Sequence, residues 1–271
     1  MSRLLSACFT RLSRHRVFWL GMVIMFVWSA LMLIAGNQYE QRILDDFFFE
    51  YAPVVGGFCA VFISLFLATD YSDGTIRNKI VVGHSRKAVY LSNMIVCLMA
   101  GIMMNAAWIL AMLTIGVPLF GWFESGTIVV LGYLLITVFM IAAFVSIFTM
   151  ISMLNQHKAS AAVTALLTFL LILFVASYCN NRLHEPEMYS ARPVFTGNVV
   201  ELSEPTQNPN YVSGNMRRIY GFLVDFLPAG QGILMANMEA MHPLLMPLYS
   251  LIIVSSTTIV GVLIFQRRDL K

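Results

Sequence analysis

Long apolar stretches alternate with short polar gaps along the chain. A helix needs about 20 apolar residues to cross the hydrocarbon core of a bilayer. Six stretches qualify, and none contains Asp, Glu, Lys or Arg: Val17–Gly36, Pro53–Thr69, Val89–Phe120, Thr127–Leu154, Ala159–Cys179 and Leu244–Phe265. The third and fourth are longer than necessary, so we expect tilt or a break near Gly116–Pro118. The pattern predicts an all-α integral membrane protein with six transmembrane helices, forming one transmembrane domain over residues 1–271.

The composition supports this class of protein. Only 11% of the 271 residues are charged and 59% are hydrophobic, with a mean hydropathy of +0.77. Soluble domains carry about 25% charged residues, so lipid rather than water is the expected solvent. The net charge of +3 gives no indication of a nucleic-acid partner.

The distribution of Lys and Arg predicts the orientation. Twelve of them lie before the first span, between spans two and three, between spans four and five, and after span six. The alternate gaps hold five. Cytoplasmic segments are enriched in Lys and Arg, so we expect both termini, and residues 70–88, in the cytoplasm.

Residues 1–16 are expected to form a helix on the membrane surface, ahead of the first span. Its apolar positions are Leu4, Leu5, Cys8, Phe9 and Leu12, and its polar positions are Arg3, Ser6, Thr10, Arg11 and Arg14. A basic face beside an apolar face suits an anionic membrane surface.

Residues 219–235 are apolar enough to suggest a seventh span, but they contain Asp225, Pro228, Gly230 and Gly232. A charge at the bilayer centre costs about 2.5–3.5 kcal/mol. We therefore expect one or two short re-entrant helices, broken at Pro228, within an extracytoplasmic region over residues 180–243.

The most polar segment is Thr69–Tyr90, "TDYSDGTIRNKIVVGHSRKAVY". Ser72 or Asp73 could cap a short helix, and Gly74 would allow a close approach to a neighbour. Thr75, Asn78 and Lys79 would share one helical face, and Gly83 would end the helix. The alternative is an ordinary basic loop that follows from the orientation of the chain.

Few residues have the chemistry of a catalytic or metal site. All five histidines lie in gaps or at span ends, and neither Gly-x-Ser-x-Gly nor His-Glu-x-x-His occurs. The cysteines Cys8, Cys59, Cys97 and Cys179 are isolated and fit as apolar fillers. The chain also lacks a Gly-x-x-x-x-Gly-Lys-Ser/Thr motif, so we expect no enzyme activity and no cofactor or metal on it.

The spans contain hydroxyl and amide groups but no charges. These groups include Asn93, Asn105, Thr137, Ser146, Ser255 and Thr258. Such side chains usually make helix–helix contacts; a substrate pathway is the alternative role. The absence of charged residues argues against ion-coupled transport, in which carboxylates or histidines usually lie within the spans.

The segment Asp70–Asn93, "DYSDGTIRNKIVVGHSRKAVYLSN", resembles the membrane subunit of bacterial ABC exporters of the second exporter class, whose transmembrane domains are similar to the ABCG-type (type V) fold. The resemblance extends over nearly the whole chain, including "FLVDFLPAGQ" at 222–231. It implies a coupling helix over Asp70–Gly83 that binds a cytoplasmic ATPase. The implied partner-binding residues are Asp70, Tyr71, Asp73, Gly74, Thr75, Arg77, Asn78, Lys79 and Gly83.

The same resemblance implies a multi-pass permease in the bacterial cytoplasmic membrane. Two ATPase subunits would hold ATP and Mg²⁺, and a second permease copy or a paralogue would complete the exporter. Its cargo would be hydrophobic or amphipathic, such as a drug, lipid or antimicrobial peptide. The sequence departs from many relatives at Asp70, where they carry Glu. A membrane scaffold or sensor that binds a cytoplasmic partner without transport is the alternative, and an ion-coupled carrier is a more distant one.

Overall fold

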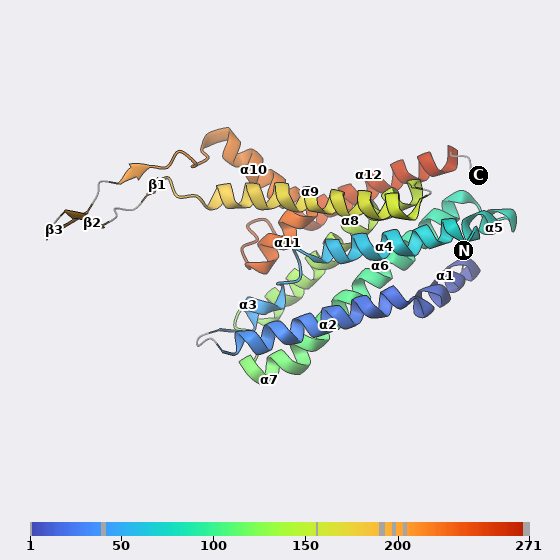
Figure 1. The fold of residues 1–271 in the computed structure, drawn as a ribbon, viewed down its shortest axis with the longest axis horizontal. Helices are drawn as coiled ribbons and strands as arrows, with labels where there is room; N and C mark the ends of the chain where they lie inside the picture. The colour runs from blue at the N-terminus through green and yellow to red at the C-terminus, as the bar shows by residue number, and fades with distance from the viewer. Residues whose placement is uncertain are drawn as a thin grey trace.

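The computed structural model describes residues 2–38, 42–155, 157–189, 193–196, 199–202 and 205–267. Within them, six helical segments are long and apolar enough to cross a membrane. They are α2 (Arg16–Gly36), α4 (Val55–Ser72), α6 (Arg86–Ala111) with its extension to Phe120, α8 (Thr127–Leu154), α9 (Lys158–His184) and α12 (Leu245–Arg267). The prediction of an all-α protein with six helices suited to span a membrane is confirmed, and the bent pair 214–226 and 228–236 together would also be apolar enough for a seventh. Figure 1 shows these helices lying side by side along the long axis of the molecule.

The third span changes its helical form near its end, close to the predicted break. After Ala111 the chain forms a π-helical turn, η1 (Met112–Gly116), and then α7 (Val117–Phe120). Pro118 has no backbone N–H and cannot bond to the carbonyl four residues earlier. A π turn widens the helix locally at such a disruption.

The N-terminal helix α1 (Ser2–Arg14) packs against α6. Leu4, Cys8 and Leu12 recur every four residues and are buried, as the apolar pattern predicts. Phe9, also assigned to the apolar face, is 36% exposed. The anchoring stripe is therefore narrower than the sequence suggests.

At one end of the bundle, which we call the α11 end, the chain folds into short elements. Helices α10 (Gly214–Phe226) and α11 (Pro228–Ala236) meet at an angle of 90°, so the predicted break at Pro228 is confirmed. The Gln231 amide donates to the backbone oxygens of Asp225 (2.9 Å) and Met246 (3.2 Å). Its oxygen accepts a hydrogen bond from Ser250 at 2.9 Å. This buried side chain thereby ties the bend to α12.

Asp45 makes a second connection at this end. It lies in α3 (Asp45–Phe48), is 5% exposed, and accepts hydrogen bonds from the backbone N–H groups of Glu124 (3.0 Å) and Ser125 (3.2 Å). The Ser125 hydroxyl also donates to it. The first and second loops at the α11 end are therefore joined by one buried carboxylate, which the sequence indicates only as an acidic loop residue.

Between α9 and α10 the chain forms two antiparallel strand pairs, which the sequence does not predict. Strand β1 (Met188–Tyr189) pairs with β4 (Thr206–Gln207), and β2 (Pro193–Thr196) with β3 (Val199–Leu202). Figure 1 shows them as an extension beyond the end of α9.

Candidate functional site

The predicted polar helix lies at the opposite end of the bundle, the α5 end. Helix α5 (Thr75–Val81) follows α4 after a tight turn, and α1 and the end of α12 lie at the same end (Figure 1). Two details differ from the prediction. The α4 helix continues through Ser72, so neither Ser72 nor Asp73 caps α5, and its N-cap is Gly74.

Gly74 has φ +65°, and no neighbour lies within 4 Å of the place where a Cβ would be. Its role is the left-handed turn conformation, which glycine adopts readily, rather than a close approach to a neighbour. Gly83, with φ +100°, lies two residues beyond α5, as expected for a terminator.

A buried charged cluster holds the inner face of α5. Asp70, in the last turn of α4, is 1% exposed. Its carboxylate forms ion pairs with Arg11 of α1 and with Lys79 of α5, the latter at 3.1 Å. The Thr75 hydroxyl donates to the same carboxylate. We call Arg11, Asp70, Thr75 and Lys79 the Asp70 cluster; it joins three helices.

Arg11 was expected on the polar face of α1, but in the structure its side chain points inward. Its guanidinium lies over the Phe66 ring, 3.8 Å from the centroid, and beside Asp70. Burial lowers the pKa of Arg11 and that of Lys79. The carboxylate and the aromatic face compensate for the loss of hydration. The period of the apolar residues could not reveal this partner, because Arg11 and Asp70 are far apart in the sequence.

Two further contacts connect the segment around α5 to the rest of the bundle. The Tyr71 hydroxyl donates to the backbone oxygen of Met153 in α8. Arg86, at the start of α6, donates to the backbone oxygens of Phe265 (3.4 Å) and Gln266 (3.1 Å) at the end of α12. A cation at a helix C-terminus is favoured by the unpaired carbonyls and the helix dipole. From the sequence, Arg86 is only one of the basic residues of the segment 70–88.

The outer face of α5 is open to solvent. Asp73, Arg77, Asn78 and Gly83 are exposed, whereas Asp70, Tyr71, Thr75 and Lys79 face inward to different extents. The tip carries two apolar side chains that sequence analysis missed, Val81 (76% exposed) and Val82 (78%). The predicted partner-binding residues therefore divide into those that attach α5 to the bundle and those that are exposed to solvent.

Most of the polar residues in the spans lie in contacts between helices. Thr257 of α12 donates to the Ser146 hydroxyl of α8 at 2.9 Å. Asn93 accepts a hydrogen bond from Cys8, and its amide nitrogen lies 3.7 Å from the Met153 sulfur. The hydroxyls of Thr137 and Thr258 lie 3.4 Å from the Met235 sulfur and 3.3 Å from the Met94 sulfur, respectively. Asn105 is buried and Ser255 is exposed. None of these six predicted residues lines the apolar groove between α2, α4 and α9 or the polar cavity beside α10.

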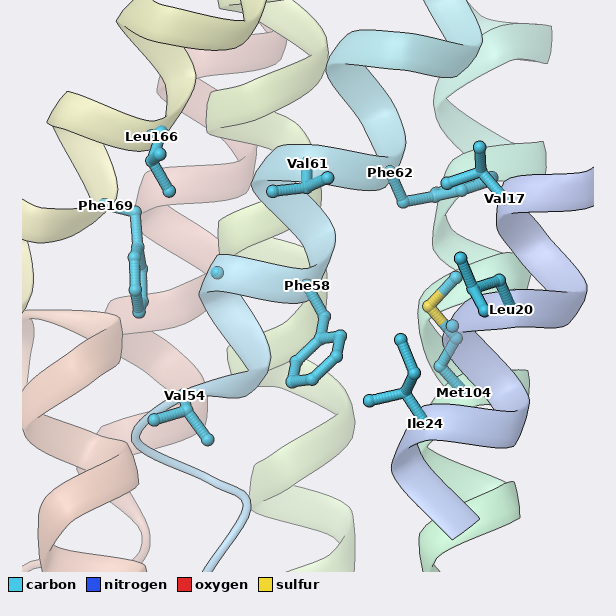
Figure 2. Close-up of a pocket in the computed structure, with 12 residues that line it drawn as sticks. Val17, Leu20, Ile24, Val54, Phe58, Val61, Phe62, Met104, Leu166 and Phe169 are labelled. Carbon is cyan, nitrogen blue, oxygen red and sulfur yellow. The ribbon is translucent and has the colours of Figure 1, made fainter. Parts of the chain in front are cut away.

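An apolar groove of about 400 Å³ lies between α2, α4 and α9. All of its lining residues are apolar or glycine, including Leu20 and Ile24 of α2, Phe58 and Val61 of α4, and Phe169 of α9. In Figure 2, Phe58 and Val61 lie between the side chains of α2 and those of α9. Such a groove can take up a hydrophobic group but offers it no hydrogen bond.

Neither a scan against models of known protein families nor a search of curated proteins gave a match to this chain. Within the described part of the chain, no three His, Cys, Asp or Glu side chains converge as metal ligands. The α5 end, with its buried anchor and its exposed face, is therefore the strongest candidate site.

His15, beside the Asp70 cluster, makes the stability of this end pH-dependent. Its ring contacts Phe62 and Phe66 edge-on, at 6.0 and 5.3 Å between centroids. Burial, with a further contribution from Arg11, lowers its pKa below 6.5. The unfolded chain therefore takes up a proton at higher pH than the folded chain, and stability falls as the pH drops below about 6.5.

We expect the midpoint of thermal unfolding in detergent to fall between about pH 7.5 and pH 5. Other groups also titrate in this range, so the comparison is with His15→Gln. The decrease should be smaller in that variant. Equal decreases in both proteins would exclude His15 as a contributor.

Proposed function

We propose that this chain is the membrane-spanning permease subunit of an ATP-driven exporter in the bacterial cytoplasmic membrane. The observation that carries the proposal is the two-sided character of α5. One face is exposed, with Arg77, Asn78, Val81 and Val82, and the other is fixed to α1 and α4 through the Asp70 cluster. The excess of Lys and Arg in the segments at the α5 end supports a cytoplasmic location for it.

In this proposal α5 is the docking element for a separate ATPase, which would hold ATP and Mg²⁺. Two ATPase subunits close together on ATP, and their movement displaces the α5 helix of each permease. Separating Asp70 from Arg11 or Lys79 would leave an uncompensated buried charge, which is unfavourable. A push on α5 therefore moves α1 and α4 with it, as a rigid-body rearrangement.

The apolar groove supports a hydrophobic or amphipathic cargo. Its volume, about 400 Å³, lies within the range of about 300–1,000 Å³ that is usual for small-molecule sites. The groove opens between α2 and α9, so a second permease copy or a paralogue placed against this face would enclose it. The cargo would then move between two permeases, without an ion site in the spans.

The experiment that tests this function is affinity purification of the chain from its native membrane in mild detergent, with mass spectrometry of the bound proteins. A Walker-motif ATPase in roughly equal amount is the expected result. Recovery of the intact chain without an ATPase, from a detergent in which a known exporter stays assembled, would overturn the proposal. A co-purified sensor protein alone would favour the membrane scaffold.

Charge reversal on the exposed face should break this association. Arg77→Glu is expected to reduce the amount of co-purified ATPase at least roughly tenfold, in line with the loss of a charged contact in an interface. Arg42→Glu makes the same charge change at the α11 end, on a side chain that is 54% exposed. Loss of the ATPase in Arg77→Glu but not in Arg42→Glu is the predicted pattern, and equal recovery in both would contradict it.

A further inference from the structure

A second, more polar cavity lies at the α11 end, far from α5. It has a volume of about 920 Å³ and is enclosed by the end of α9, by α10, and by the start of α12. One wall is apolar, with Phe222 of α10 and Leu245 and Tyr249 of α12. Nothing in the proposed coupling mechanism uses this cavity.

The polar part of the cavity contains an amide without a partner. Asn180 of α9 is 7% exposed and lines the cavity, yet its Oδ1 atom is buried and has no hydrogen-bond partner among the described residues. A buried acceptor of this kind is unfavourable unless a donor reaches it. A ligand whose hydroxyl or N–H group reached this oxygen would satisfy it.

The protonation of His184, one helical turn further along α9, follows from its two contacts. Its Nδ1 lies 2.8 Å from the backbone oxygen of Asn180, and its Nε2 lies 3.2 Å from a carboxylate oxygen of Glu239. Both partners are hydrogen-bond acceptors, so both contacts favour the protonated ring. The Asn180 backbone oxygen and Glu239 accordingly raise the pKa of His184 above its ordinary value.

The charged side chains around the cavity leave two arginines without a carboxylate partner among the described residues. Glu239 is paired with His184, and Asp225 is paired with His242 at 3.0 Å. Arg217 and Arg218 line the same cavity. Arg217 donates to the backbone oxygen of Leu183 at 3.0 Å, whereas Arg218 has no hydrogen bond or ion pair within the described part of the chain. Each carboxylate of the cavity is thus paired with a histidine, and neither arginine is paired with a carboxylate among the described residues, so the cavity favours an anion.

We propose that this cavity binds an anionic amphiphile whose head group also carries a hydroxyl. The anionic group would lie near Arg217 and Arg218, the hydroxyl would donate to Asn180, and the apolar chain would lie along Phe222, Leu245 and Tyr249. A membrane phospholipid with a glycerol head group has this chemistry, and so does a soluble polyol phosphate that lacks the chain.

The test is native mass spectrometry of the full chain, released from detergent with defined lipids. Phosphatidylglycerol carries the charge and the hydroxyls, phosphatidylmethanol carries the charge alone, and phosphatidylcholine carries neither a net charge nor a hydroxyl. We expect phosphatidylglycerol to bind most tightly, phosphatidylmethanol less, and phosphatidylcholine roughly tenfold or more below phosphatidylglycerol.

Two variants test the need for a hydroxyl and the need for a negative charge separately. Asn180→Leu should reduce phosphatidylglycerol binding to the level of phosphatidylmethanol. Arg218→Gln, at an exposed residue whose loss leaves the fold intact, should weaken both anionic lipids by a similar factor. Arg42→Gln, at the same end of the bundle but outside this cavity, is the matched control and should change neither.

Equal binding of all three lipids, or the same lipid preference in all variants, would overturn the proposal. Glycerol 1-phosphate, which has the head-group chemistry but no apolar chain, is the soluble ligand for comparison. If it binds as tightly as phosphatidylglycerol, the site belongs to a small polar anion and the amphiphile assignment is wrong. If Asn180→Leu fails to fold, Arg218→Gln still decides the anion requirement.

Discussion

Replacement of Asp70 with alanine is expected to lower the free energy of unfolding by about 3–5 kcal/mol, as found when one partner of a buried ion pair is removed. The substitution leaves the half-buried side chains of Arg11 and Lys79 next to each other without a counter-charge. It also removes the acceptor for the Thr75 hydroxyl. Unfolding by sodium dodecyl sulfate in mixed micelles, followed by far-ultraviolet circular dichroism, measures this change.

Asp73→Ala is the matched control. Asp73 has the same side chain, lies three residues further along, and is exposed. Its replacement should change the stability by less than about 0.5 kcal/mol. If the two variants are equally stable, the Asp70 cluster does not anchor α5, and the mechanical part of the proposed function fails with it.

Gly230→Ala should have an effect of similar size at the other end of the bundle. A Cβ at position 230 would lie 2.2 Å from the backbone oxygen of Val224 and 2.8 Å from its Cα. Backbone atoms cannot move aside as a flexible side chain can, so the 90° bend between α10 and α11 must open. We expect a loss of about 3 kcal/mol, at the upper end of the usual cost of overpacking.

Gly221→Ala provides the control within the same pair of helices. No atom lies within 4 Å of the Cβ position at Gly221. Alanine favours the helical conformation over glycine by about 1 kcal/mol, so this variant should be neutral or slightly more stable. A destabilised Gly221→Ala together with a stable Gly230→Ala would show that the bend is not packed as described.

The spans could be predicted because hydropathy and length decide them, but their ends depend on tertiary contacts. The second span was expected to stop at Thr69, before the charge of Asp70. The helix continues to Ser72 because Arg11 and Lys79 compensate that charge inside the protein. No local pattern contains this information, since one of the cations comes from α1.

The candidate site was predictable as a segment but not as a cluster. The glycines and polar residues of 70–83 indicated a short helix, and α5 is there. The inward direction of Arg11 was not predictable, because an arginine opposite an apolar stripe normally faces water. The strands between α9 and α10 were not predicted, although "PVFTGNVVEL", 193–202, has a hairpin pattern around Gly197-Asn198, because residues 180–243 were described only as an extracytoplasmic region.

The packing of α12 has a consequence for the order in which the molecule is assembled. This helix lies along α8, where Thr257 meets Ser146, and its end receives the Arg86 side chain. Yet the ribosome makes it roughly 90 residues after α8, an interval on the order of 5–20 s at usual rates of synthesis. During that time the α12-binding face of α8 must be covered by lipid or by the insertion machinery. The carbonyls of Phe265 and Gln266, which Arg86 binds, exist only once these residues have been synthesised, so the contact between α6 and α12 forms late in assembly.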